Sequence, residues 1–226
     1  MLKNDLKDIG EEYYEILKDL DSIPMHRGQL YETIVTTQGP TNTKNAAPMG
    51  VLCKNYSQIT LYLNEGSHTS INILNNKYFI VNITQDPLLF AISTLKDMED
   101  DYYEDYEGIP YLKNTDAFFI AHTEDIKEVV REDKFGINII YVITARVDEI
   151  VRINKGALPL NRGIYSVIET LIHYSRFDLA DCETKDKYWN RIKELNRVAQ
   201  KVGSKKDKEA MYLIMKNLKE NFKDLN

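Results

Sequence analysis

The sequence contains little cysteine, no excess of basic charge and no long apolar run. Its two cysteines, Cys53 and Cys182, lie far apart and match no metal-ligand spacing, so we expect a reducing compartment and no disulfide framework. The net charge of -6 argues against a nucleic-acid partner, because neutralising phosphates requires clustered Lys and Arg. No apolar run approaches membrane-spanning length, and residues 1–5 enter a charged segment without a signal core. We therefore expect a cytoplasmic protein without a membrane partner.

What the sequence does contain is a globular composition, with 43% hydrophobic residues in a chain of 226. That length suits one large domain, or one domain with an appendage. The chain is organised around residues 31–52, where β-branched residues fill 31–37 and a second short apolar stretch covers 47–52. The residues between them hold the Gly, Pro and Asn of a turn. This pattern predicts a β-hairpin with a long polar loop.

The hairpin has small side chains where a plain scaffold would have bulky ones. These small or polar residues are Thr36, Thr37, Asn45, Ala46, Ala47 and Gly50. Small residues let a flat ligand come close to the backbone. The alternative is a surface hairpin whose threonines serve only β propensity.

Further strands are predicted at 58–63, 77–84, 116–122 and 137–147, which makes at least six. A short helix is expected at 67–76, with Ser67 or Thr69 as its cap, and another at 86–95, with Asp86 as cap and Pro87 in its first turn. The free N–H groups at the start of the first helix form a natural phosphate seat, although many helix caps hold no anion.

Helical periodicity appears at both ends of the chain. Apolar residues three to four apart over 2–20 predict an amphipathic helix, which Gly10 weakens. The same spacing after Gly163 predicts three helices, with 158–162 as the linker before them. On the first of these, Glu169 and His173 lie four apart and could begin a metal site; without a third ligand, a surface pair is the stronger interpretation.

Two blocks of the sequence resemble the FMN-binding split-barrel (flavin reductase-like) superfamily. The first is Thr36-Thr37 with the later stretch 45–49 (NAAPM), and the second is 66–73 (GSHTSINI) followed by 78–82 (YFIVN). In that superfamily a Thr-rich strand precedes an N-A-A-P-like strand, and a T-x-x-N helix precedes an F-V-V-N strand. The whole chain, with its helical tail, is similar to an archaeal family of split-barrel proteins.

The resemblance implies a mainly β fold with α: an FMN-binding split β-barrel, Greek-key-like, plus an N-terminal helix and a C-terminal three-helix appendage. We expect the N-terminal helix and lead-in at 1–28, the barrel at 29–153 and the helical domain at 154–226. The implied cofactor is FMN, a flat ring with a phosphate, which requires small residues, edge donors and an anion seat. Split barrels of this kind are usually homodimers.

The resemblance also assigns cofactor-binding residues in two sets. The isoalloxazine ring and ribityl chain would be lined by Thr36, Thr37, Asn45, Ala46 and Ala47. The phosphate would be held by Ser67, His68, Thr69 and Asn72. The loop 38–44 lacks the acidic, glycine-rich turn often seen in the reductases, and His68 replaces a different polar residue; these departures bear on the nicotinamide partner more than on the flavin.

Three functions remain open from the sequence. The first is an oxidoreductase that passes a hydride or electrons from a reduced nicotinamide, NADH or NADPH, to an unknown acceptor, with the chemistry supplied by FMN and no identified catalytic residue. The second is a non-catalytic flavin carrier or sensor acting through a protein partner. The third is a barrel for another planar ligand, such as a pterin, or an oligomeric scaffold.

Two other features have alternative interpretations. The run 97–107 (DMEDDYYEDYE) is typical of a solvated loop; the alternative is a mobile lid in which Tyr102, Tyr103 or Tyr106 covers the flavin. His122 could act as a base, but a histidine at a strand end is more often a surface residue.

Overall fold

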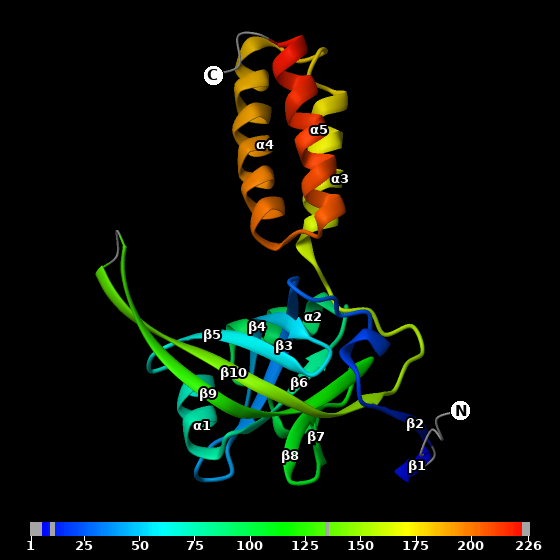
Figure 1. The fold of residues 1–226 in the computed structure, drawn as a ribbon, viewed down its shortest axis with the longest axis vertical. Coiled ribbons are helices and arrows are strands. Elements are labelled where there is room, and N and C mark those ends of the chain that lie inside the picture. The colour runs from blue at the N-terminus through cyan, green and yellow to red at the C-terminus, as the bar shows by residue number, and fades with distance from the viewer. Residues whose placement is uncertain (1–5, 10–11, 134–135, 223–226) are drawn as a thin grey trace. The chain divides into compact units, whose positions relative to one another are not determined.

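The computed structural model describes residues 6–9, 12–133 and 136–222 (Figure 1). Contacts divide the chain into two compact units, residues 1–160 and 161–226. The segment 154–160 lies in the first unit, where Ala157 belongs to the barrel core and Leu160 bridges to Glu32. Each unit is considered by itself.

The first unit contains a closed six-stranded antiparallel barrel within the described residues. Its strands are β3 (Leu30–Gln38), β4 (Lys44–Asn55), β5 (Gln58–Asn64), β6 (Tyr78–Ile83), β9 (Ala117–Asp133) and β10 (Gly136–Arg152). They follow the order β10-β5-β4-β3-β6-β9, and β9 pairs with β10 to close the sheet. The predicted split barrel and its strands are therefore confirmed, although β3 and β4 extend further into the expected loop and β9 continues eleven residues past His122.

Alternate residues of these strands fill the barrel interior, as the period of two requires. Val35, Val51, Leu61, Val81 and Phe119 are all fully buried members of one core cluster. Helix α1 (His68–Asn76) adds Ile73 to that cluster and contacts β3, β4, β5 and β6. The core therefore fixes α1 against the strands that carry the candidate site.

Local signals placed the two short helices correctly. Ser67 is the N-cap of α1, and its side chain accepts a hydrogen bond from the N–H of Ser70. Asp86 caps α2 (Pro87–Leu95) by accepting from the N–H of Leu88, with Pro87 in the first turn. Both predictions are confirmed because the capping interactions are contained within a few residues.

The predicted N-terminal helix is wrong where the structure describes it. The chain forms β1 (Leu6–Ile9) and β2 (Glu12–Leu17), while residues 1–5 and 10–11 lie outside the described part. β2 pairs with residues 150–152 of β10, beyond the stretch of β10 that pairs with β5. An ion pair joins Glu15 to Arg152 across that pairing. The free edge of β10 thus overrides a helical periodicity that Gly10 already weakens.

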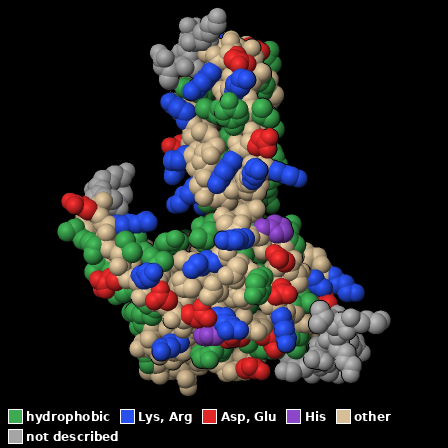
Figure 2. All heavy atoms as spheres, viewed as in Figure 1, with side chains coloured by type: hydrophobic (Ala, Val, Ile, Leu, Met, Phe, Trp, Pro, Cys, Tyr) green, Lys and Arg blue, Asp and Glu red, His purple; other side chains and the backbone are tan. Residues whose placement is uncertain are grey.

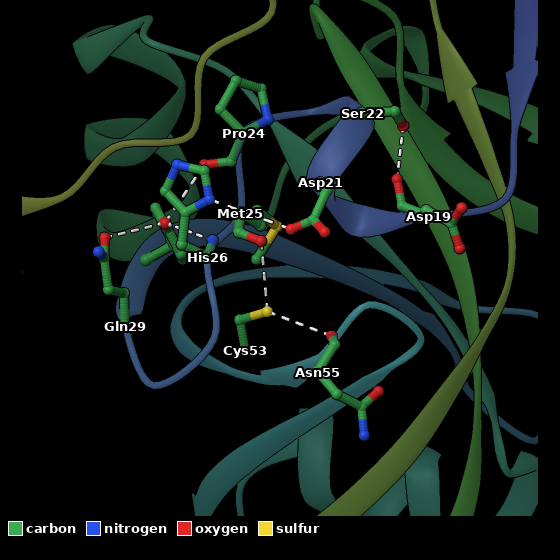
Figure 3. Close-up of polar contacts among 10 residues, drawn as sticks. Asp19, Asp21, Ser22, Pro24, Met25, His26, Gln29, Cys53 and Asn55 are labelled. Atoms are coloured by element: carbon green, nitrogen blue, oxygen red, sulfur yellow. Dashed lines mark hydrogen bonds and ion pairs between the residues drawn. The ribbon is translucent and has the colours of Figure 1, made fainter.

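The segment between β2 and β3 contributes Leu20, Ile23 and Met25 to the barrel core. It contains the 3-10 helix η1 (Leu20–Ser22), and the Tyr31 hydroxyl accepts a hydrogen bond from the N–H of His26 at 2.8 Å. The Cys53 thiol faces the carbonyl oxygens of Met25 and Asn55 at 3.5 and 3.3 Å (Figure 3). Burial raises the pKa of Cys53 to about 11, so this thiol is a core group and no nucleophile.

The acidic, tyrosine-rich run is structured, which corrects the expectation of a loop. It contains η2 (Asp100–Tyr102) and β7 (Tyr103–Tyr106), which forms a hairpin with β8 (Ile109–Leu112). Its acids are exposed as predicted, but Tyr103 and Tyr106 point into two core clusters. The two tyrosines of β7 lie three residues apart, so the period of two places them on opposite faces of the hairpin, Tyr103 in the cluster with Ile34 and Tyr106 in the cluster with Phe118. A lid formed by either buried tyrosine does not match this arrangement.

The second unit is the predicted three-helix appendage, with α3 (Arg162–Ser175), α4 (Cys182–Val202) and α5 (Lys205–Asn221). Trp189, Ile192, Met211 and Leu218 lie in its core. Lysine and arginine side chains are spread over its visible face (Figure 2). Among the helices described in either unit, none is long and apolar enough to cross a membrane.

Candidate functional site

Eight of the nine predicted flavin-binding residues lie on three neighbouring elements, β3, β4 and α1, and the ninth, Ser67, is the N-cap of α1. The register pairs Thr36 with Ala46 and Thr37 with Asn45. Because side chains alternate between the faces of a strand, these two pairs point in opposite directions. The structure therefore divides the predicted set between the two faces of the hairpin.

On the α1 side, four predicted residues meet in one hydrogen-bonded cluster. The Asn72 amide donates to Thr37 Oγ1 at 2.9 Å. The Asn45 amide donates to Thr69 Oγ1 at 3.1 Å and to Thr37 Oγ1 at 3.4 Å. Thr37 and Thr69 are about 1% exposed, whereas Asn45 is half-buried. The cluster joins β3, β4 and α1, and Asn45 is its most accessible member.

On the opposite face, Thr36 belongs to a closed network. Thr36 Oγ1 accepts from the Asn82 amide at 3.0 Å, and the same amide donates to the Ile34 carbonyl at 2.9 Å. The Asn82 side-chain oxygen accepts from the N–H of Leu112 at 2.8 Å. Thr36 and Asn82 are fully buried. Ala46 packs on this face against the cluster that contains Ile34 and Leu112.

The start of α1 holds the other predicted phosphate ligands. Ser67 Oγ accepts from the N–H of Ser70 at 3.2 Å, and the first intrahelical bond runs from the N–H of Ile71 to the Ser67 carbonyl at 3.0 Å. The N–H groups of His68 and Thr69 precede that bond, as the first N–H groups of any helix do. The His68 side chain is exposed. This end of α1 has the positive dipole that favours an anion.

Strand β4 is unusually open over its first half. Every residue of 45–50 is only half-buried, including Ala46, Ala47 and Gly50, whereas Val51 and Cys53 are buried. A strand with both faces partly accessible and with small side chains leaves room for a flat ring beside its backbone. Ala47 thus lies in the open half of β4.

Lys44, a neighbour of this region, was missed from the sequence. Lys44 pairs with Asp100 at 3.2 Å, and its ammonium lies 5.6 Å from the centre of the Tyr103 ring. Tyr103 is buried with no hydrogen-bond partner for its hydroxyl among the described residues, and burial, with Asp97 and Asp100 nearby, raises its pKa to about 12. The acidic run gave no signal of these contacts, which depend on the β7–β8 hairpin.

The remaining chemical candidates have separate outcomes. His122 is half-buried, and its Nδ1 lies 2.7 Å from a carboxylate oxygen of Asp148. Glu169 and His173 both lie on α3, and no group of metal-ligating residues is found among the residues that the structure describes.

Comparisons with known proteins place this geometry in a family. Residues 31–146 match the family model described as protein of unknown function (DUF447) N-terminal domain, and residues 161–216 match protein of unknown function (DUF447). Uncharacterized protein MJ1453 of Methanocaldococcus jannaschii is 32% identical over 191 residues, which cover 83% of this chain and 97% of that protein.

A crystal structure of the FMN-bound protein MM1853 from Methanosarcina mazei, assigned to the same DUF447 family, is 29% identical with a TM-score of 0.50. The match covers 88% of this chain and 99% of that one. A flavin reductase domain protein from Arthrobacter sp. FB24 is 17% identical with a TM-score of 0.47, over 60% and 84% of the two chains. The split-barrel chain with its helical tail belongs to the DUF447 family.

Proposed function

We propose that this protein binds FMN and is an oxidoreductase, which passes a hydride or electrons from a reduced nicotinamide to an acceptor. The observation that carries the proposal is the contact between Asn45 and Thr69, 3.1 Å apart, which joins the open half of β4 to the start of α1. The FMN-bound relative MM1853, similar over 88% of this chain, supports the same cofactor.

The residues present fit that cofactor. A flavin mononucleotide requires a flat approach to the backbone, polar groups along one edge and an anion seat. The half-exposed small residues of 45–50 provide the flat approach to the backbone, and the Asn45 amide provides a polar group along the edge. The exposed first turn of α1, with Ser67 and His68, provides the anion seat.

When bound, FMN would supply the redox chemistry. The chain's own residues would hold and orient the cofactor. Asn72 fixes Thr37, and Asn45 ties β4 to Thr69, so the polar groups of the site are positioned before a ligand arrives. The mutual hydrogen bonds also keep these groups from being left unpaired.

We also propose that the protein is a cytoplasmic homodimer. The β9–β10 hairpin continues past β6 and β5 as an arm, defined here as residues 123–133 of β9 and 136–139 of β10. Hydrophobic side chains are exposed along it (Figure 2), among them Val130 at 62% and Ile137 at 72%. Exposed apolar surface of this kind supports a contact between copies, and the two free cysteines are consistent with a reducing compartment.

The visible absorption spectrum tests the proposal directly. The purified protein would be loaded with FMN, desalted and then mixed anaerobically with NADPH or NADH. We expect retained flavin absorbance that bleaches with a nicotinamide. Retained flavin that does not bleach would favour a non-catalytic carrier, and loss of all flavin on desalting would overturn the proposal.

A double variant, Thr69→Ala with Asn72→Ala, tests the location of the site. We expect it to lose FMN retention, because it removes both α1 contributions to the cluster. Asn64→Ala, at the exposed end of β5, is the matched control and should retain flavin. Unchanged retention in the double variant, shown to be folded by circular dichroism, would place the flavin elsewhere.

A further inference from the structure

A cavity of about 690 Å³ lies at the opposite end of α1 from Ser67. Its walls are the β3–β4 turn, the last residue of α1, the start of β6, the β7–β8 turn and one stretch of β10. None of the nine predicted flavin-binding residues lines it. Its volume is in the range of pockets that hold small molecules, and the proposed function makes no use of it.

A β-bulge directs two carboxylates into this cavity. In the β9–β10 register Val147 pairs with Ala121 and Glu149 pairs with Ile120, so Asp148 is an extra residue. Adjacent strand residues normally point to opposite faces, but a bulge re-aims them. As a result both Asp148 and Glu149 line the cavity.

Each carboxylate is held in place by a side chain behind it. Asp148 lies 2.7 Å from Nδ1 of His122, and Glu149 accepts a hydrogen bond from the Tyr106 hydroxyl. Burial, together with the hydrogen bond to Glu149, raises the pKa of Tyr106, so Tyr106 keeps its proton and remains a donor. The two acceptors are therefore positioned on a rigid strand, which is what a binding site requires.

The rest of the lining indicates what those carboxylates bind. No lysine or arginine is among the residues that line the cavity. The end of β3, the β3–β4 turn and α1 contribute the amides of Gln38, Asn42 and Asn76, and the β7–β8 turn contributes a third carboxylate, that of Glu107. The Tyr78 ring, half exposed, offers an aromatic face, and Ile120 an apolar one. Ammonium groups donate to carboxylates and lie over aromatic faces, while a short carbon chain packs on apolar walls.

We propose that this cavity is a second ligand site, which binds a small protonated amine through Asp148 and Glu149 with its carbon skeleton against Tyr78. The site does not depend on flavin. It differs from a divalent metal site, because no group of metal-ligating residues is found in the described part of the chain.

Isothermal titration of the flavin-free full chain with putrescine, a four-carbon diamine, tests the proposal without any substitution. We expect saturable binding that weakens with added salt, and at least tenfold weaker binding of butanediol, its neutral isostere. If the heat of binding does not saturate up to about 10 mM putrescine, the affinity is negligible and the proposal is overturned. Equal binding of butanediol would also overturn it, because recognition would then not involve charge.

Single neutralising variants locate the site. Asp148→Asn and Glu149→Gln should each weaken putrescine binding at least fivefold, whereas Glu128→Gln, the same change at an exposed position of β9, should not. Tyr78→Leu leaves both carboxylates in place and should weaken putrescine binding severalfold. It therefore still tests the site if a carboxylate variant fails to fold. Equal losses in Glu128→Gln and in the cavity variants would overturn the assignment.

Discussion

Thr36 and Thr37 are the same residue at adjacent positions of β3, yet they belong to different regions of the molecule. Each hydroxyl accepts a hydrogen bond from an asparagine amide, Asn82 for Thr36 and Asn72 for Thr37. The Thr36 network ends in the buried backbone of β3 and β8, whereas the Thr37 network ends in Asn45, which is half-buried. The closed network stabilises the barrel, and we propose that the open one binds the ligand.

The largest expected effect comes from breaking the closed network. Asn82→Ala would leave the Ile34 carbonyl and the Leu112 N–H buried without their partner, which costs about 3 kcal/mol of the free energy of unfolding. Because Trp189 lies in the helical unit, its fluorescence does not report on the barrel. The barrel is instead followed in urea through the accessibility of the buried Cys53 thiol to a thiol reagent, in a Cys182→Ala background.

The control for that experiment is Asn64→Ala, since Asn64 is exposed at the end of β5. It should change the urea midpoint little. An Asn82→Ala barrel as stable as the control would show that the closed network contributes nothing to stability, and the contrast with Thr37 would lose its basis.

A second prediction concerns pH and the buried second half of β4, which contains Cys53. The folded protein raises the pKa of Cys53 from 9.0 to about 11, so it holds the thiol proton more tightly than the unfolded chain does. The free energy of unfolding should therefore fall as pH rises from 9 to about 11, by about 2 kcal/mol from this group. Urea titrations across that range should show a smaller fall in Cys53→Ala.

Cys182→Ala is the matched control, because Cys182 is exposed at the start of α4. Both variants keep the tyrosines that also titrate at high pH; the charge of Cys53 helps to raise the pKa of Tyr31, so the difference between the variants includes this coupling. The same pH dependence in Cys53→Ala as in Cys182→Ala would mean that the buried thiol is not the group responsible.

The sequence predicted those parts of the fold whose signals are local. Ser67 and Asp86 mark helix starts because each cap bonds to an N–H two or three residues away. The strand pattern is equally local, since it depends only on alternation. The helix predicted from apolar periodicity was wrong at β2, because the partner of β2 is the edge of β10, more than a hundred residues later.

The candidate site shows the same limit. The motifs identified Thr37, Asn45, Thr69 and Asn72, which do meet, but they also grouped Thr36 with Thr37. Alternation along β3 could have separated the two threonines. The β-bulge at Asp148 could not have been found in this way, because a one-residue register shift leaves no composition signal.

A third prediction tests the open network through its accessible member. Asn45→Ala removes the amide that joins β4 to Thr69, and we expect FMN to bind about tenfold more weakly, the effect of losing one hydrogen-bonded group at a site. Quenching of flavin fluorescence on titration with protein measures it. Asn64→Ala should bind as the unaltered protein does; a similar affinity in Asn45→Ala would remove Asn45 from the site.

The smallest expected effects come from Thr36→Ser and Thr37→Ser, which keep each hydroxyl and remove one buried methyl group. Both side chains are about 1% exposed or less, so each change should lower the free energy of unfolding by about 1 kcal/mol or less. FMN affinity should stay within about twofold in both variants, because the acceptor for Asn72 or Asn82 remains. If Thr37→Ser alone weakened FMN binding as much as Asn45→Ala, the methyl group and not the hydrogen-bond network would shape the open face, and the two threonines would differ by packing instead of by the exposure of their networks.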